Sequence, residues 1–217
     1  MIAQAKPFTT YSLTEDVLSA VSHGIGTAIA IVGLVFLVLR GAANEDTFQV
    51  VAGSIFGASL IFSYLSSTLY HSLRIRSVRT LFRKLDHSAI YVLIAGTYTA
   101  LMLGILRGGW GWSFFGIAWG IALLGILLKI FRMGKHPRLS LATYLGMGWL
   151  CVIGIYPLWT QLPRQSFYLL LAGGLIYSAG AILYAMKKIP YTHALWHLFV
   201  LGGSIAHFLC VYTAFRS

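Results

Sequence analysis

The chain has 217 residues, of which 58% are hydrophobic and only 10% are charged, with a formal net charge of +11. Its mean hydropathy of +0.80 is too high, and its charge too sparse, for a soluble domain that must cover its surface with polar groups. These values exclude an ordinary soluble protein and indicate a single polytopic membrane domain over residues 1–217.

Seven apolar stretches follow one another along the chain, and each is close to the 20 residues that a helix needs to cross the hydrocarbon core. They lie at 17–39, 48–70, 86–106, 112–131, 141–160, 166–186 and 191–214. The first is too long for the apolar region of a cleavable signal peptide. Because a helix satisfies its own backbone hydrogen bonds in lipid, strands are not expected. The prediction is an all-α bundle of seven transmembrane helices.

Two glycine pairs in these stretches have the spacing that lets membrane helices approach closely. Gly53 and Gly57 form one small-xxx-small pattern, and Gly116 and Gly120 form another. Since glycine has no side chain, either pattern would allow the backbone of a neighbouring helix to come near.

The basic residues are distributed unevenly between the two sides of the predicted bundle. If the N-terminus is cytoplasmic, only four basic residues face the other side: Arg40, Arg107, Arg164 and Arg216. The remaining 12 of the 16 are Lys6, Arg74, Arg76, Arg79, Arg83, Lys84, Lys129, Arg132, Lys135, Arg138, Lys187 and Lys188. This bias predicts a cytoplasmic N-terminus and a periplasmic C-terminus. The basic loops are expected to contact anionic membrane lipids, so the net charge requires no nucleic-acid partner.

Polar residues of three spans are predicted at one membrane depth, at the cytoplasmic end. His71 ends the second span and Asp86 begins the third, whereas the other four carboxylates of the chain lie in polar or flanking segments. His193 and His197 lie near the start of the seventh span, four residues apart and therefore on one helical face. Ser67 precedes His71 by the same spacing.

Three histidines from two helices would suit a zinc ion. Zinc takes imidazole nitrogen in tetrahedral geometry, and three protein ligands (His71, His193 and His197) leave a place for water. Zinc lowers the pKa of bound water to about 7. Asp86 could take a proton from that water or orient a ligand, and the Ser67 hydroxyl could bind water or substrate. This chemistry suggests hydrolysis of an amide or ester in a lipid.

Simpler interpretations compete with the metal site. The His-x-x-x-His spacing lacks the glutamate of the HExxH motif, and a single histidine at a membrane interface is usually only hydrogen-bonded. Two same-face pairs and a carboxylate at one depth favour a functional site. His87 points about 100° away from Asp86 on a helix and is left outside it. His207, deeper in the seventh span, is expected to form a separate polar spot, and the role of His23 in the first span stays open.

Four motifs make the chain resemble the hemolysin III family, the bacterial branch of the progestin and adiponectin receptor group. They are STLYH ending at His71, KLDHS around Asp86, HALWH from His193 to His197, and EDVLSAVSHGIG near the N-terminus. In the last motif serines stand at 19 and 22, where the family pattern would have Asn and Thr. The resemblance covers nearly the whole chain. The group belongs, with alkaline ceramidases, to a wider superfamily of seven-span proteins.

The resemblance implies that His71, His193 and His197 bind zinc and that Asp86 and Ser67 lie next to the metal-bound water. It also implies a location in the bacterial inner membrane and a ceramidase-like hydrolysis, although function does not follow from fold. Two alternatives stay open: a non-catalytic sensor or regulator of membrane state with a structural zinc, and a channel or cytolytic pore. A pore should show a polar stripe through the bilayer, whereas polar residues here gather at one end.

Overall fold

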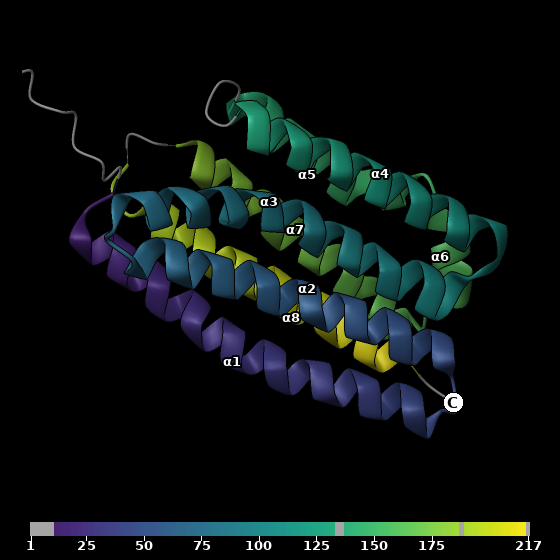
Figure 1. The fold of residues 1–217 in the computed structure, drawn as a ribbon. Coiled ribbons are helices and arrows are strands. Elements are labelled where there is room, and N and C mark those ends of the chain that lie inside the picture. The colour runs from purple at the N-terminus through teal and green to yellow at the C-terminus, as the bar shows by residue number, and fades with distance from the viewer. Residues whose placement is uncertain (1–10, 133–136, 187–188, 216–217) are drawn as a thin grey trace, which may run out of the picture.

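The computed structural model describes residues 11–132, 137–186 and 189–215, which form an all-helical bundle (Figure 1). The helices are α1 (Leu13–Ala43), α2 (Thr47–Ser72), α3 (Arg76–Leu101), α4 (Gly108–Arg132), α5 (Pro137–Gly148), α6 (Ile155–Gln161), α7 (Arg164–Ala185) and α8 (Thr192–Ala214). A π-helical turn, Met102–Leu106, extends α3, and a 3-10 turn, Trp149–Val152, follows α5. No strand occurs within the described ranges. Of the basic residues named above, Lys6, Lys135, Lys187, Lys188 and Arg216 lie outside them.

Six helices are long and apolar enough to cross a membrane: α1, α2, α3 with its π-helical turn, α4, α7 and α8. The fifth predicted span is instead a bent pair, in which α5 and α6 meet at 56°. The stretch 141–160 is therefore broken, and it supplies a seventh span only if the bent pair crosses the membrane as one. Pro157 lies in the first turn of α6, where its missing N–H and its ring prevent a helix from continuing through. The chain thus has six or seven spans, and the sidedness of its termini stays a prediction.

One of the two glycine pairs brings helices together. At Gly57 a Cβ atom would lie only 3.0 Å from the Cα of Leu34, and at Gly53 it would lie 3.1 Å from the Cβ of Leu37. These glycines therefore permit the close packing of α1 on α2. At Gly116 and Gly120 a Cβ atom would meet nothing within 4 Å. Within the described chain this second pair therefore has open space beside it and brings no helix close.

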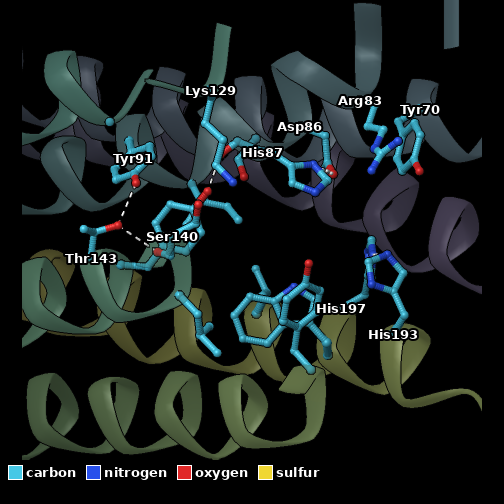
Figure 2. A pocket seen from close by; sticks show the side chains of 18 of the residues that line it. Tyr70, Arg83, Asp86, His87, Tyr91, Lys129, Ser140, Thr143, His193 and His197 are labelled. Carbon is cyan, nitrogen blue, oxygen red and sulfur yellow. Dashed lines mark hydrogen bonds and ion pairs between the residues drawn. The ribbon is translucent and has the colours of Figure 1, made fainter. Parts of the chain in front are cut away.

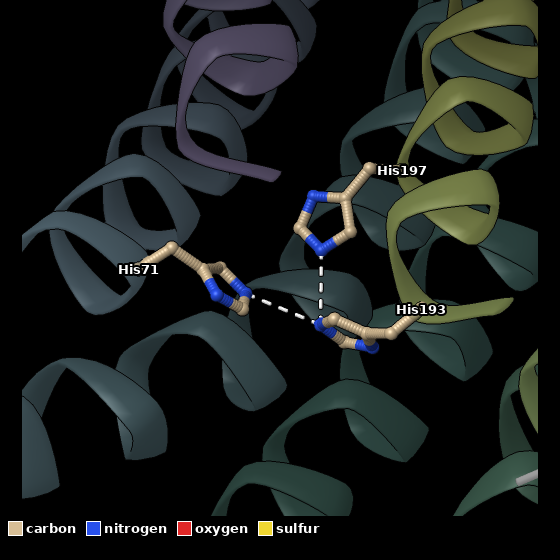
Figure 3. Close-up of side chains that lie close together, drawn as sticks. All are labelled: His71, His193 and His197. Atoms are coloured by element: carbon tan, nitrogen blue, oxygen red, sulfur yellow. Dashed lines mark hydrogen bonds between the residues drawn. The ribbon is translucent and has the colours of Figure 1, made fainter. Parts of the chain in front are cut away.

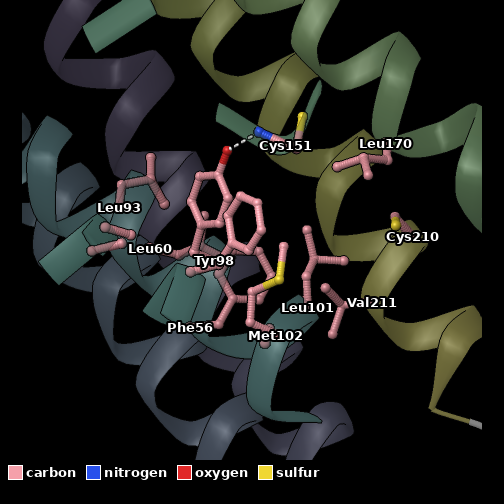
Figure 4. Close-up of a cluster of buried hydrophobic side chains, with 14 of the residues drawn as sticks. Phe56, Leu60, Leu93, Tyr98, Leu101, Met102, Cys151, Leu170, Cys210 and Val211 are labelled. Carbon is pink, nitrogen blue, oxygen red and sulfur yellow. Dashed lines mark hydrogen bonds between the residues drawn. The ribbon is translucent and has the colours of Figure 1, made fainter. Parts of the chain in front are cut away.

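The core lies around α3, the most buried of the six long helices. In its most apolar stretch of 18 residues 78% are buried, against at most 50% in the corresponding stretch of the other five. Side chains from α2, α3 and α8, including Phe56, Leu101 and Val211, fill this core (Figure 4). The Tyr98 hydroxyl donates to the Gly148 carbonyl at 3.1 Å and accepts from the Cys151 amide at 2.7 Å. It thereby satisfies backbone groups that the break between α5 and α6 leaves free.

The outer surface of the bundle is apolar, as lipid contact requires. Large hydrophobic side chains stay exposed along α1 and α4, for example Val32, Phe36, Leu123 and Leu124. A surface of this kind would be an aggregation hazard in water but suits hydrocarbon. The chain is therefore a multi-pass membrane protein.

The helix directions bring distant segments of the chain to one end of the bundle. The starts of α1, α3 and α8 lie beside the ends of α2, α4 and α7 (Figure 1). His71 is in the last turn of α2 and His193 in the first turn of α8, so both belong to this end.

Candidate metal centre

Three buried histidines converge at that end (Figure 3). The Nε2 atom of His193 lies 3.2 Å from Nε2 of His71 and 3.1 Å from Nε2 of His197. The three residues are 2%, 7% and 2% exposed for His71, His193 and His197. His193 and His197 project from successive turns of α8, as their spacing predicted. This group could hold a metal ion.

Two of the separations in the group match those around a tetrahedral cation. Metal–nitrogen bonds of zinc length in tetrahedral geometry place neighbouring nitrogens about 3.3 Å apart, close to the separations of His193 from His71 and His197. All three ligand nitrogens lie within 4.8 Å of one another. The Nδ1 atom of His71 lies 2.8 Å from the carboxylate Oδ1 of Asp16. Because the carboxylate is an acceptor, it keeps a proton on Nδ1, and a neutral His71 then directs a free lone pair on Nε2 at the other two rings.

The partner of His71 is itself held by a buried ion pair. The guanidinium of Arg79 donates to Oδ1 and Oδ2 of Asp16 at 2.9 and 2.8 Å, and both residues are 2% exposed. Asp16 and Arg79 were not predicted to belong to the site, since the first lies in a flanking segment of the sequence and the second in a basic loop. The burial of Asp16 could have been inferred from the sequence of α1. Asp16, His23 and Ala30 are spaced seven residues apart, which places them on one face of the helix, and this face is buried.

The N-terminal part of the described chain covers the histidines. The Tyr11 ring stacks on His193 with centroids 4.1 Å apart, and the Glu15 carboxylate accepts the His193 amide N–H at 3.3 Å. His23 packs on His197 with ring centroids 4.0 Å apart and directs Nε2 at the His197 carbonyl oxygen, 3.4 Å away. His23 is therefore a buried neighbour of the group, which it joins through ring packing.

Asp86 lies on the wall of a cavity of about 400 Å³ that His193 and His197 also line (Figure 2). Its Oδ2 atom is 3.3 Å from Nδ1 of His87. The expectation that His87 points away from Asp86 was wrong, because both side chains are long enough to turn into the same cavity despite the angle between their Cα–Cβ bonds.

Ser67 lies one turn before His71, as expected, but it is buried at 1% exposure. Its hydroxyl finds no hydrogen-bond partner among the residues that the structure describes. A buried hydroxyl without a partner is unfavourable, and Ser67 is not among the residues that line the cavity. Its catalytic role, like that of Asp86, stays a prediction.

The cavity continues toward the interior of the bundle. A second, smaller cavity of about 100 Å³ is lined by apolar side chains of α3 and α7, among them Leu93, Leu101 and Leu170. His207 borders it and places Nε2 3.2 Å from the Leu170 carbonyl, well separated from the histidine group. Six residues line both cavities, which are therefore adjacent: Ser63, Ile90, Leu141, Tyr144, Trp196 and Val200.

Comparison with known proteins gives a consistent result. Residues 11–208 match the family described as Haemolysin-III related, and this range contains the whole histidine group. Hemolysin-3 homolog of Bacillus subtilis (strain 168) is 46% identical over 201 residues, covering 93% of this chain and 94% of that protein. Hemolysin-3 of Bacillus cereus is 45% identical over 202 residues, 93% and 92% of the two chains. Monocyte to macrophage differentiation factor of Homo sapiens is 26% identical over 208 residues, 91% and 83% of the two chains.

Proposed function

Because this chain belongs to the haemolysin III family, we propose that it is a zinc-dependent hydrolase of lipid-like amides or esters in the bacterial inner membrane. The observation that carries the proposal is the convergence of His71, His193 and His197 beside a cavity with Asp86 on its wall. A catalytic site needs this combination of ligands, an ionisable group and space for a substrate.

The number of ligands supports a catalytic rather than a structural metal. Structural zinc sites are usually closed by four protein ligands, whereas catalytic sites use three and keep one position open. Within the described residues the group offers three ring nitrogens. A zinc ion bound there would polarise a carbonyl oxygen and make water acidic enough to react at neutral pH.

Residues of the chain supply the remaining functions. Asp86 would accept the proton of the attacking water at its carboxylate, and the contact with His87 would keep that carboxylate facing the cavity. Asp16 would hold His71 in the orientation that presents Nε2. The Ser67 hydroxyl would find its missing partner in water or substrate.

The shape of the cavities supports a lipid-like substrate. The larger cavity places polar side chains beside the histidines, and the adjacent one is almost wholly apolar. An amphiphile would lie with its scissile carbonyl in the first and an acyl chain in the second. Burial of that chain would supply binding free energy of about 0.8 kcal/mol per CH₂ group.

A regulator with a structural metal is the second candidate, and a different observation favours it. The histidine group joins α2 to α8, and the Asp16–Arg79 pair extends the connection to α1 and α3. A metal that links four helices would stabilise one arrangement of the bundle without any chemistry.

Zinc content and hydrolysis, measured on the same detergent-purified protein, separate the two candidates. For a hydrolase, Asp86→Asn should retain zinc and lose turnover of short-chain ceramides or acyl esters by about 10²-fold or more, because it removes the general base. Asp46→Asn is the matched control, since Asp46 forms an ion pair with Arg107 at the opposite end of the bundle.

Ser67→Ala is a second variant for the same test. If the protein is a hydrolase, this variant should have reduced turnover and should retain zinc. Its control is Ser59→Ala, which removes a buried hydroxyl bonded to the Phe56 carbonyl of its own helix. The hydrolase should be abandoned if the wild type turns over none of these substrates while Asp86→Asn weakens zinc binding by about 10–100-fold.

A further inference from the structure

Two basic side chains line the larger cavity without an acidic partner: Arg83 of α3 and Lys129 of α4 (Figure 2). All five carboxylates of the chain lie in the described ranges. Their ion pairs within 4.0 Å join Asp16 to His71 and Arg79, Asp86 to His87, and Asp46 to Arg107. Neither Arg83 nor Lys129 takes part in any of them.

Lys129 is the more informative of the two because it is buried. The residue is only 8% exposed, and its ammonium lies 5.6 Å from the centroid of the Tyr144 ring. A lysine near the end of a membrane helix usually extends toward the headgroups and keeps its charge in water. Lys129 instead lines the cavity, and among the described residues its ammonium lies over the face of the Tyr144 ring, which offsets part of the loss of water. A buried charge of this kind indicates a ligand of opposite sign.

The charges around this part of the cavity do not cancel. Asp86 lies between the two basic residues in the view of Figure 2, but its carboxylate contacts His87. One negative and two positive side chains therefore leave an excess positive charge beside the place proposed for the reacting carbonyl. A neutral ceramide-like headgroup would not compensate it, whereas a phosphate or carboxylate would.

We propose that Lys129, assisted by Arg83, binds the anionic headgroup of an amphiphile whose acyl chain occupies the adjacent apolar cavity. The substrate of the proposed hydrolase is then an acylated lipid that carries a phosphate or carboxylate. That last statement rests on the proposed function, but the binding site itself does not. Trp196 and Val200 line both cavities and lie where the headgroup and the chain would meet.

The test measures binding to the purified full-length chain in a neutral detergent, by mass spectrometry of the intact complex. The probes share one oleoyl chain: oleoyl-glycerol phosphate, oleate and neutral mono-oleoylglycerol, with inorganic phosphate as the probe without a chain. We expect at least one of the two anionic amphiphiles to bind tenfold or more tightly than the neutral one, and the stronger of the two identifies the headgroup. Inorganic phosphate alone should bind weakly, because it lacks the apolar chain.

Variants then locate the site. Lys129→Gln should weaken binding of the anionic probe by roughly tenfold to hundredfold, the effect of losing one charge-assisted contact. Lys129→Arg should restore most of it, which shows that a loss is due to charge rather than misfolding. Lys84→Gln is the matched control: it removes one charge from the same end of α3, at a residue that does not line the cavity, and should change affinity less than twofold.

Two results would overturn the inference: equal binding of neutral and anionic amphiphiles, or unchanged affinity in Lys129→Gln. The proposed hydrolase fails in a distinguishable way. Binding that depends on Lys129 without any hydrolysis would leave the anionic site standing and remove the enzyme. Hydrolysis of neutral amides, together with unchanged affinity of Lys129→Gln for the anionic probe, would leave the enzyme standing and remove the anionic site.

Discussion

Asp16 and His71, which are 55 residues apart in the sequence, place a carboxylate Oδ1 of α1 2.8 Å from the Nδ1 of a ring in α2. The contact lies in a buried environment, and the same carboxylate is bonded to Arg79 of α3. It orients one of three converging rings and joins three helices. The histidine group therefore depends on a residue that offers no ligand atom to it.

Replacing Asp16 with Asn should weaken metal retention without removing any of the three ring nitrogens. Asn can still accept the Nδ1 proton of His71, but it loses the charge that strengthens this hydrogen bond and that neutralises Arg79. We expect zinc affinity to fall about 10–100-fold, measured by competition with a chelator of known affinity.

The same change should destabilise the protein by about 3–5 kcal/mol, because it leaves Arg79 buried beside a neutral partner. Asp46→Asn, which removes the partner of Arg107 far from the histidines, should leave zinc affinity unchanged. If both variants retain zinc equally well, Asp16 does not orient His71 for a metal.

The packing of α1 on α2 predicts opposite effects at two glycines with the same sequence pattern. Gly57→Ala should destabilise the bundle by about 1–3 kcal/mol, because the new methyl group would lie 3.0 Å from the Leu34 backbone. Gly120→Ala should be neutral or stabilise by up to about 1 kcal/mol, because no described residue lies within 4 Å of the new methyl group and alanine favours a helix. Unfolding in detergent measures both, and equal effects would contradict the packing.

Membrane sidedness follows from the distribution of basic residues. We expect a reporter fused after Ser217 to be periplasmic and one inserted between α2 and α3, near Arg74, to be cytoplasmic. The histidine group lies at the α2–α3 end of the bundle, so this result would also place the site at the cytoplasmic face. Two reporters on the same side would exclude an odd number of spans between them.

Much of this architecture could be predicted because it depends on local patterns. Apolar stretches of membrane length mark the helices, and the four-residue spacing of His193 and His197 places both rings on one face whatever their surroundings. The break between α5 and α6 was missed because the apolar composition continues across it. Pro157 was the available signal, since proline cannot continue a helix from the preceding turn.

The surroundings of the site could not be predicted, because they depend on contacts between helices. Asp16 resembles an ordinary acidic residue in a first helical turn, and only packing reveals that it meets His71 and Arg79. The burial of Lys129 likewise depends on α5, which places Tyr144 against it. Glycine spacing alone did not distinguish Gly57 from Gly120, since the pattern permits an approach without supplying a neighbour.

Zinc binding by the three histidines can be tested most directly through the metal content of the purified protein. The wild type should carry about one zinc per chain, and His71→Ala, His193→Ala or His197→Ala should each lose most of it, because each removes one of the three ligands. His207→Ala, which removes a partly buried histidine outside the group, should retain it. A wild type without metal, or a His71→Ala variant with undiminished zinc, would show that the histidine group does not hold zinc in this way.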